Sequence, residues 1–137
     1  MTALRRRAVG GARIVVVDDD PAVLRAVAAV LEADGYQVEG ARDQGQALRA
    51  LLADPPALVV LDVNMPGLDG WELCDILRRQ SHTRDVPVLF LTGRVDLRDQ
   101  ITAMQVGGSD YVTKPFRPEE LRAKVRAWMR RRPRRHA

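Results

Sequence analysis

The sequence contains one cysteine, six aromatic residues and no long apolar run. Because Cys74 is the only cysteine, no internal disulfide can form, and a reducing compartment is expected. No apolar stretch approaches the ~18 residues that a membrane span needs. The N-terminal arginines are not followed by the apolar segment of a signal peptide, because the run 14–17 ends at three aspartates. We therefore expect a soluble, cytoplasmic protein that makes no contact with a membrane.

Acidic residues are missing from both ends of the chain. Residues 1–13 carry four arginines and residues 129–137 carry five, with no Asp or Glu in either segment. Residues 14–128 hold 13 basic and 18 acidic side chains, so the centre is acidic although the whole chain has a net charge of +4. Basic ends can contact nucleic acid or an acidic surface, but more often they are solvated ends or linkers.

At 137 residues, 46% of them hydrophobic, the chain is long enough for one domain with a buried core. Short apolar runs predict strands at residues 14–17, 36–40, 58–61, 88–91 and 110–113. Helical spacing predicts helices that begin at Pro21, near Ala47, near Asp69, after Asp96 and at Pro118. Five strands that alternate with five helices predict an α/β fold with a doubly wound parallel sheet.

The strand that follows Pro55-Pro56 carries the first candidate functional residue. Leu58–Leu61 is a run of four apolar residues, two of them β-branched, which predicts a strand buried on both faces. Asp62 stands at its carboxyl end, and residues 63–67 cannot continue the strand. Ligands of open parallel sheets bind outside the carboxyl ends of the strands, so Asp62 is the leading candidate.

Polar residues also follow the neighbouring strands. Asp18 and Asp19 end the first strand, Thr92 ends the fourth, and Lys114 follows the fifth. In a parallel sheet these ends share one edge, which gathers three carboxylates, a hydroxyl and an ammonium in one crevice. A single strand-end aspartate is usually a helix cap, as we expect for Asp20. The convergence of all five groups is much harder to explain by packing.

Clustered carboxylates repel one another, and two unit charges ~4 Å apart cost on the order of 4 kcal/mol at an effective dielectric near 20. An all-oxygen site with open positions suits Mg²⁺, for which Mn²⁺ can substitute. Zinc is not expected, because Cys74 falls in a predicted helix, His82 in a loop and His136 in the tail. A carboxylate beside a metal, with Lys and Thr opposite, is an arrangement for phosphoryl transfer.

Four segments carry a family resemblance: Val15–Pro21, Asp62–Gly70, Leu91–Gly93 and Asp110–Phe116. In order and spacing they resemble the receiver domains of bacterial two-component response regulators, the CheY-like superfamily. The resemblance implies a flavodoxin-like, doubly wound five-stranded parallel sheet of order 2-1-3-4-5 with five helices. It divides the chain into a basic N-terminal extension (1–12), a receiver domain (13–131) and a basic tail or linker start (132–137).

The resemblance also implies roles for the residues at the predicted crevice. Asp62 would be the phosphoacceptor and would take a phosphoryl group from a histidine kinase. Asp18, Asp19, Asp62 and the backbone carbonyl of Asn64 would hold Mg²⁺, with Asp18 acting through water. The chain would then be a phosphorylation-controlled switch and not an enzyme that turns over a substrate.

The remaining roles implied by the resemblance concern the response to the phosphoryl group. Lys114 would pair with that group, and its approach would be set by a cis peptide bond before Pro115. Only X-Pro peptide bonds adopt the cis form at a low cost in free energy. Thr92 and Tyr111 would be the switch pair. The hydroxyl of Thr92 would move toward the phosphate while the ring of Tyr111 turns inward.

The output face implied by the resemblance comprises the helix after Asp96, the last strand and the last helix. Receiver domains of DNA-binding regulators dimerise there through ion pairs, and this chain keeps Asp110, Glu120 and Lys124 of that pattern. Gln100 stands where a cation would pair with Glu120. The expectation is a weak, phosphorylation-dependent homodimer, with no direct nucleic-acid binding by this domain alone.

Two other classes remain as alternatives. A phosphatase of haloacid-dehalogenase type also uses a strand-end aspartate with Mg²⁺, Thr and Lys. Its nucleophile would lie on the first strand, however, and a second aspartate would stand two residues later, where this chain has Asn64. The other alternative is a basic-tailed nucleic-acid or scaffold module whose acidic site is vestigial, and the presence of every expected site residue argues against it.

Overall fold

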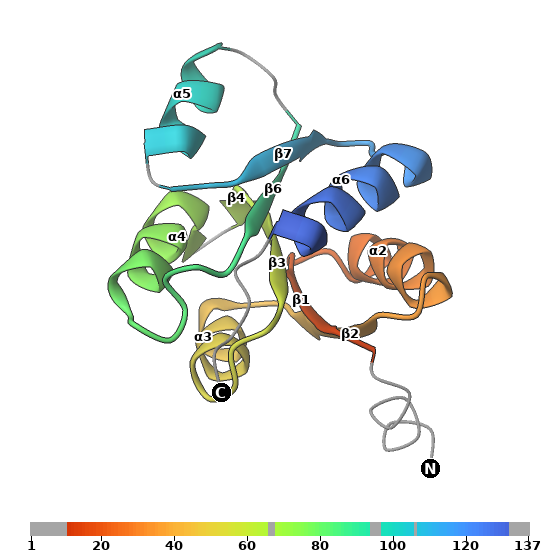
Figure 1. Cartoon of the computed structure of the whole chain (residues 1–137). Helices are drawn as coiled ribbons and strands as arrows, with labels where there is room; N and C mark the ends of the chain where they lie inside the picture. The colour runs from red at the N-terminus through yellow and green to blue at the C-terminus, as the bar shows by residue number, and fades with distance from the viewer. Residues whose placement is uncertain (1–10, 66–67, 94–96, 106, 132–137) are drawn as a thin grey trace.

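The computed structural model describes residues 11–65, 68–93, 97–105 and 107–131. Within them, a five-stranded sheet lies between two layers of helices (Figure 1). The strands are β1 (Arg13–Val17), β2 (Gln37–Ala41), β3 (Leu58–Asp62), β6 (Val88–Thr92) and β7 (Asp110–Thr113). The helices are α2 (Pro21–Ala33), α3 (Gln44–Leu52), α4 (Gly70–Arg79), α5 (Leu97–Gln105) and α6 (Pro118–Arg131).

The sheet order is β2-β1-β3-β6-β7, and every neighbouring pair is parallel. This is the predicted order 2-1-3-4-5, so the flavodoxin-like fold is confirmed. The predicted strands lie within one residue of the observed ones at either end. Their carboxyl ends lie along one edge of the sheet, which is where the sequence placed the candidate site.

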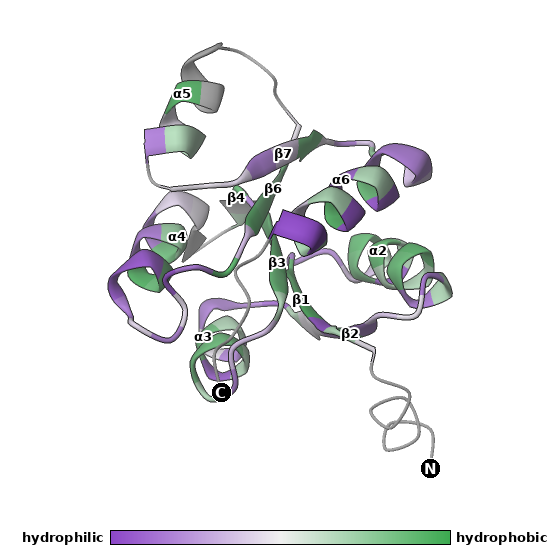
Figure 2. Cartoon of the chain, in the orientation of Figure 1, coloured by the Kyte–Doolittle hydropathy of each residue, from purple (hydrophilic) through white to green (hydrophobic). Residues whose placement is uncertain are grey.

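Successive side chains of a strand point to opposite faces, which explains why the central strands are apolar throughout (Figure 2). Val59 and Leu61 pack into the core beneath α3 and α4, whereas Leu58 and Val60 pack into the core beneath α2 and α6. All five residues of β3 are buried. Asp62 is therefore held at the end of a strand that is fixed from both sides.

The starts of the first two helices follow capping rules. Asp20 accepts a hydrogen bond from the backbone N–H of Ala22 at 2.9 Å and precedes a proline, so its predicted role as the N-cap of α2 is confirmed. Asp43 caps α3 by accepting from Gln46, whose side chain in turn accepts from the backbone N–H of Arg42. Asp96, after which a helix was predicted to begin, lies outside the described residues.

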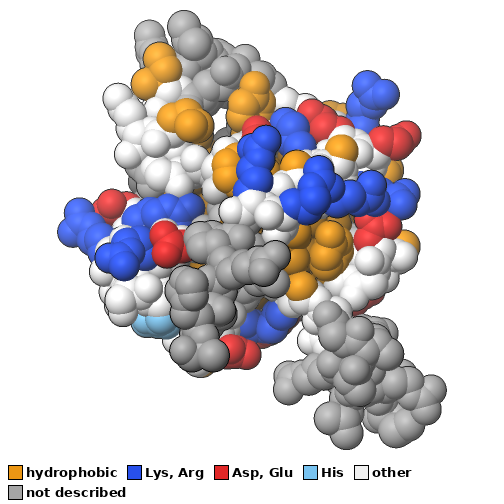
Figure 3. Space-filling view, in the orientation of Figure 1, with side chains coloured by type: hydrophobic (Ala, Val, Ile, Leu, Met, Phe, Trp, Pro, Cys, Tyr) orange, Lys and Arg blue, Asp and Glu red, His pale blue; other side chains and the backbone are white. Residues whose placement is uncertain are grey.

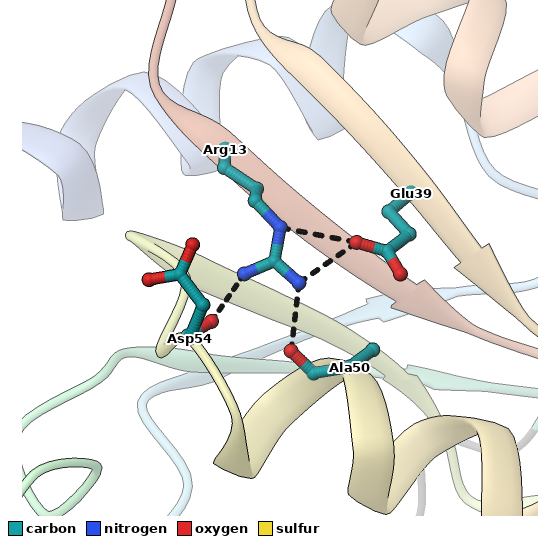
Figure 4. Close-up of polar contacts among 4 residues, drawn as sticks. All are labelled: Arg13, Glu39, Ala50 and Asp54. Carbon is teal, nitrogen blue, oxygen red and sulfur yellow. Dashed lines mark hydrogen bonds and ion pairs between the residues drawn. The ribbon is translucent and has the colours of Figure 1, made fainter.

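Arg13, the first residue of the predicted receiver domain, makes contacts that the sequence did not predict (Figure 4). Its guanidinium donates to the carboxylate of Glu39 on β2, with a closest distance of 2.7 Å. It also donates to the backbone carbonyls of Ala50, at 2.7 Å, and Asp54. These carbonyls lie at the carboxyl end of α3, where positive charge is favourable. Arg13 therefore fastens α3 to β1 and β2.

A small hairpin after β3 was not expected from the sequence. Its strands, β4 (Asn64–Met65) and β5 (Leu68–Asp69), pair antiparallel and return the chain to the start of α4. A side chain at Gly70 would place its Cβ 3.0 Å from both the carbonyl oxygen of Asp62 and the Cα of Val63. Glycine therefore permits α4 to begin directly against the end of β3.

Among the described residues, no helix combines the length and apolar character needed to cross a membrane.

Candidate functional site

Three strand ends bring an ammonium between two buried carboxylates. Asp62 ends β3 and Asp18 directly follows β1, and their side chains are 4% and 0% exposed. Lys114 follows β7, and its Nζ lies 2.8 Å from Oδ2 of Asp18 and 3.2 Å from Oδ2 of Asp62. The peptide bond between Lys114 and Pro115 is cis, as predicted.

A third carboxylate completes the acidic cluster. One side-chain oxygen from each of Asp18, Asp19 and Asp62 lies within 4.8 Å of the others. Asp18 is oriented by the backbone N–H of Asp20, which donates to its Oδ1 at 2.9 Å. Asp19 is exposed, so the cluster faces solvent on that side. The single charge of Lys114 leaves the three carboxylates with excess negative charge.

The pKa values of Asp18 and Lys114 shift in the direction that their surroundings dictate. Burial raises the pKa of Asp18, because the charged form loses water, although Lys114 and the N–H of Asp20 oppose the change. Burial also works against the charged form of Lys114. The hydrogen bond to Asp18 and the charges of Asp62 and Asp18 outweigh burial and raise the pKa of Lys114. Lys114 is therefore an ammonium at neutral pH.

The donor set fits a hard cation such as Mg²⁺. All three side chains offer carboxylate oxygens, and Mg²⁺ binds few carboxylates and keeps several waters. Soft ligands lie elsewhere: Cys74 is buried in α4, and burial raises the pKa of its thiol to about 11. His82 is exposed in the loop after α4, and His136 lies outside the described residues.

The other predicted site residues lie at or near the same sheet edge. Thr92 is buried at the end of β6, and its carbonyl accepts the backbone N–H of Lys114 at 2.7 Å. Asn64 follows Asp62 by two residues, and its backbone pairs with Asp69 in the β4–β5 hairpin. Tyr111 is half-buried on β7, where the ammonium of Lys124 lies 4.8 Å from the centre of its ring.

The residues of the predicted dimer face are paired within one chain. Lys124 donates to the carbonyl of Tyr111 at 2.6 Å and lies within 3.6 Å of carboxylate oxygens on Asp110 and Glu120. The indole N–H of Trp128 donates to Asp110 at 3.2 Å. These contacts attach α6, over which Lys and Arg side chains gather in Figure 3, to β7. The sequence indicated these residues but not their pairing within the chain.

Ser109 directly precedes β7, and Gln100 lies in α5, two elements of the predicted dimer face. Ser109 accepts a hydrogen bond from the backbone N–H of Val88 at 3.1 Å, so its hydroxyl links β6 to the start of β7. The side chain of Gln100 lies outside the described residues.

Three carboxylates and a lysine lie together at the carboxyl edge of a parallel sheet. With a bound cation, such a site is suited to phosphoryl transfer. The sequence matches the family described as "Response regulator receiver domain" over residues 14–126. The chain therefore belongs to the response-regulator receiver domain family. This match favours the receiver interpretation over the phosphatase and the basic-tailed module.

Individual relatives agree with the family match. The DNA-binding dual master transcriptional regulator RpaA of Synechocystis is 46% identical over 121 residues, which are 87% of this chain and 49% of that protein. The DNA-binding response regulator MtrA of Mycolicibacterium smegmatis is 42% identical over 119 residues, 87% of this chain and 51% of that one. The chain thus spans about half the length of these curated relatives.

Two similar solved structures share the fold over nearly their whole length. The chemotaxis response regulator CheY4 of Vibrio cholerae is 30% identical, with a TM-score of 0.82 over 86% of this chain and 98% of that one. The receiver domain of the Francisella response regulator 1452 is also 30% identical, with a TM-score of 0.81 over 88% of this chain and 98% of that one.

Proposed function

We propose that Asp62 is the phosphoacceptor of this receiver domain. The observation that carries the proposal is the position of the Lys114 ammonium, which lies 3.2 Å from Asp62 and 2.8 Å from Asp18 at the carboxyl edge of the sheet. A carboxylate at the end of a rigid buried strand is fixed in place for attack. The direct test is phosphoryl uptake from acetyl phosphate, measured with and without Mg²⁺.

In the proposed reaction, a carboxylate oxygen of Asp62 attacks the phosphorus atom of a phosphohistidine. An oxygen–phosphorus bond forms, the nitrogen–phosphorus bond breaks, and the electron pair stays on the imidazole nitrogen. Lys114 then pairs with the negative oxygens of the new acyl phosphate. The reaction is a single transfer onto the protein, so we propose a switch and not an enzyme with turnover.

Asp18, Asp19, Asp62 and the backbone carbonyl of Asn64 are the proposed ligands of Mg²⁺, with Asp18 acting through water. The bound cation would neutralise charge on the phosphoryl oxygens. Support for this set comes from the three carboxylates, whose oxygens lie within 4.8 Å of one another. Mn²⁺ has the same preference for oxygen ligands and is expected to substitute.

We propose that Thr92 and Tyr111 report the phosphoryl group to the output face. Phosphorylation adds ~1.5–2 negative charges, which attract the hydroxyl of Thr92 and the ammonium of Lys114 toward Asp62. Thr92, at the end of β6, pairs with Thr113 of β7. Thr113 follows Tyr111 on the same strand by two residues. A shift of Thr92 can thereby reach β7, α5 and α6.

The relatives suggest the partners of the whole protein. RpaA and MtrA are described as DNA-binding regulators, and this chain covers about half of each. We propose a sensor histidine kinase as the phosphoryl donor and DNA binding through a part of the protein outside this domain. The proposed bounds are a basic extension at 1–12, the receiver domain at 13–131 and a tail or linker start at 132–137.

Replacement of Asp19 with alanine should abolish Mg²⁺ binding while the fold survives. Asp19 is exposed, and its charge adds to the repulsion within the cluster, so the melting temperature without Mg²⁺ should stay equal or rise. The neighbouring variant Asp20→Ala is the matched control, because it removes the α2 cap, which costs about 1 kcal/mol, and keeps the metal ligands. Thermal melts with a Mg²⁺ titration measure both effects, and a clear fall for Asp19→Ala would make Asp19 structural.

The oligomeric state should depend on the occupancy of Asp62. Without a phosphoryl group we expect a monomer, because Lys124, Asp110 and Glu120 are already paired within the chain. With the phosphoryl mimic beryllofluoride we expect a weak dimer, since exposed ion pairs contribute only ~0–1 kcal/mol each. Light scattering over a concentration series measures this difference. A tight dimer in both states would mean that Asp62 does not control this face.

A further inference from the structure

Arg78, near the end of α4, binds two separate loops through backbone carbonyls. Its Nε donates to the carbonyl of Gly107, after α5, at 2.8 Å. Its Nη1 donates to the carbonyls of Val86 and Arg84, before β6, at 2.7 and 3.1 Å. One half-buried guanidinium thus ties the chain that follows α5 to α4 and to the chain that enters β6.

The carboxyl end of α5 is fixed by backbone contacts as well. The N–H of Gly107 donates to Met104 and that of Gly108 donates to Ala103, which closes the last turn of the helix. Gly107 has a φ of +89°, and a Cβ there would lie 3.0 Å from the Arg78 side chain. A Cβ on Gly108 would lie 2.2 Å from the ring of Phe90. This end of α5 is therefore seated directly on β6.

The described side chains of α5 make few buried contacts. Among its residues 101–105, whose side chains are described, only Ala103 is buried. Ile101 and Met104 are 47% and 65% exposed, and apolar side chains lie at the surface over α5 (Figure 3). Figure 1 shows α5 beside β7 at the margin of the molecule. A helix with few buried apolar contacts can change its angle at a low cost in free energy.

We infer that Arg78 is a positioning residue that fixes the carboxyl end of α5, so that α5 turns about this end when the phosphorylation site is occupied. The inference rests on the proposed function, because the force on α5 comes from the shift of Thr92 at the end of β6. Arg78 contacts neither Asp62 nor Lys114 in the described contacts. Its role is to convert that shift into one defined movement of α5.

The chain offers two reporters for the test. Met65, in β4, is buried and follows Asp62 by three residues. Ile101 is the only isoleucine of α5 among three in the sequence. Methyl NMR of Met and Ile therefore reads site occupancy and α5 position in one sample. We would compare the full chain with Arg78→Leu, in Mg²⁺ with and without beryllofluoride. The matched control is Arg79→Leu, since Arg79 is exposed and pairs only with Asp75 of its own helix in the described contacts.

In the wild type and in Arg79→Leu, beryllofluoride should shift both the Met65 and the Ile101 methyl signals. In Arg78→Leu, Met65 should shift as in the wild type, whereas Ile101 should lose its shift. Arg78→Lys, which keeps the charge and one donor, should give an intermediate shift of Ile101 and covers the case in which the leucine variant unfolds. A purely structural role would lower the melting temperature and leave the Ile101 shift intact.

A wild-type Ile101 shift in folded Arg78→Leu would overturn the inference and leave the proposed function standing. If Met65 did not respond to beryllofluoride in the wild type, the proposed function itself would fail, and the inference would fail with it. The two failures are therefore read from different methyl groups.

Discussion

Asp62→Asn should abolish phosphoryl uptake from acetyl phosphate while the domain stays folded. The substitution keeps the size of the side chain, but an amide cannot supply the nucleophilic oxygen. In the unphosphorylated protein it removes one of the three clustered carboxylates, and the charge of Asp62 is one cause of the raised pKa of Asp18. The melting temperature without Mg²⁺ should therefore stay equal or rise. Loss of labelling then cannot be attributed to unfolding.

Intact-mass measurement after incubation with acetyl phosphate and Mg²⁺ gives the answer directly. The wild type should gain the mass of one phosphoryl group, and Asp62→Asn should gain none. Asp85→Asn is a suitable control, because Asp85 is an exposed carboxylate. It lies in the loop before β6, whereas the candidate site lies at the carboxyl ends of the strands. Undiminished uptake by Asp62→Asn would falsify the assignment of the phosphoacceptor.

The fold and the main site were predictable because they depend on short-range patterns. A strand buried on both faces must be apolar throughout, so Leu58–Leu61 could be identified without tertiary information. Parallel strands align their carboxyl ends, which is why Asp18, Asp62 and Lys114 could be placed together from sequence positions alone. The cis bond before Pro115 followed from the family resemblance and not from spacing.

The contacts missed by the sequence depend on long side chains that reach backbone carbonyls far along the chain. Arg13 binds carbonyls 37 and 41 residues away, and Arg78 binds a carbonyl 29 residues away. A carbonyl is present at every residue, so no residue type marks the partner in advance. The β4–β5 hairpin was missed for a different reason, because strands of two residues are too short to show a periodic pattern.

Lys114→Met should destabilise the domain at neutral pH in the absence of Mg²⁺. Asp18 is fully buried, and Lys114 is its partner at 2.8 Å, so the variant leaves a buried carboxylate next to Asp62 without its counter-ion. Breaking a buried pair costs ~3–5 kcal/mol, but Lys114 is 27% exposed, so we expect about 1–3 kcal/mol after solvent screening. Chemical denaturation of the two proteins side by side measures this loss.

The pH dependence of that loss tests its electrostatic origin. The pKa of Lys114 is raised in the folded chain, so its stabilising effect is complete at neutral pH and disappears only as the pH rises through the raised value. Without Lys114, the pKa of Asp18, already raised by burial, should rise further, and a carboxyl group with a raised pKa takes up protons on folding. The variant should therefore recover stability relative to the wild type as the pH falls from 7 toward 5.

Mg²⁺ should stabilise Lys114→Met more than it stabilises the wild type, and Lys114→Met/Asp18→Asn should be more stable than Lys114→Met alone. A pH-independent difference that neither Mg²⁺ nor Asp18→Asn reduces would show that Lys114 acts through packing.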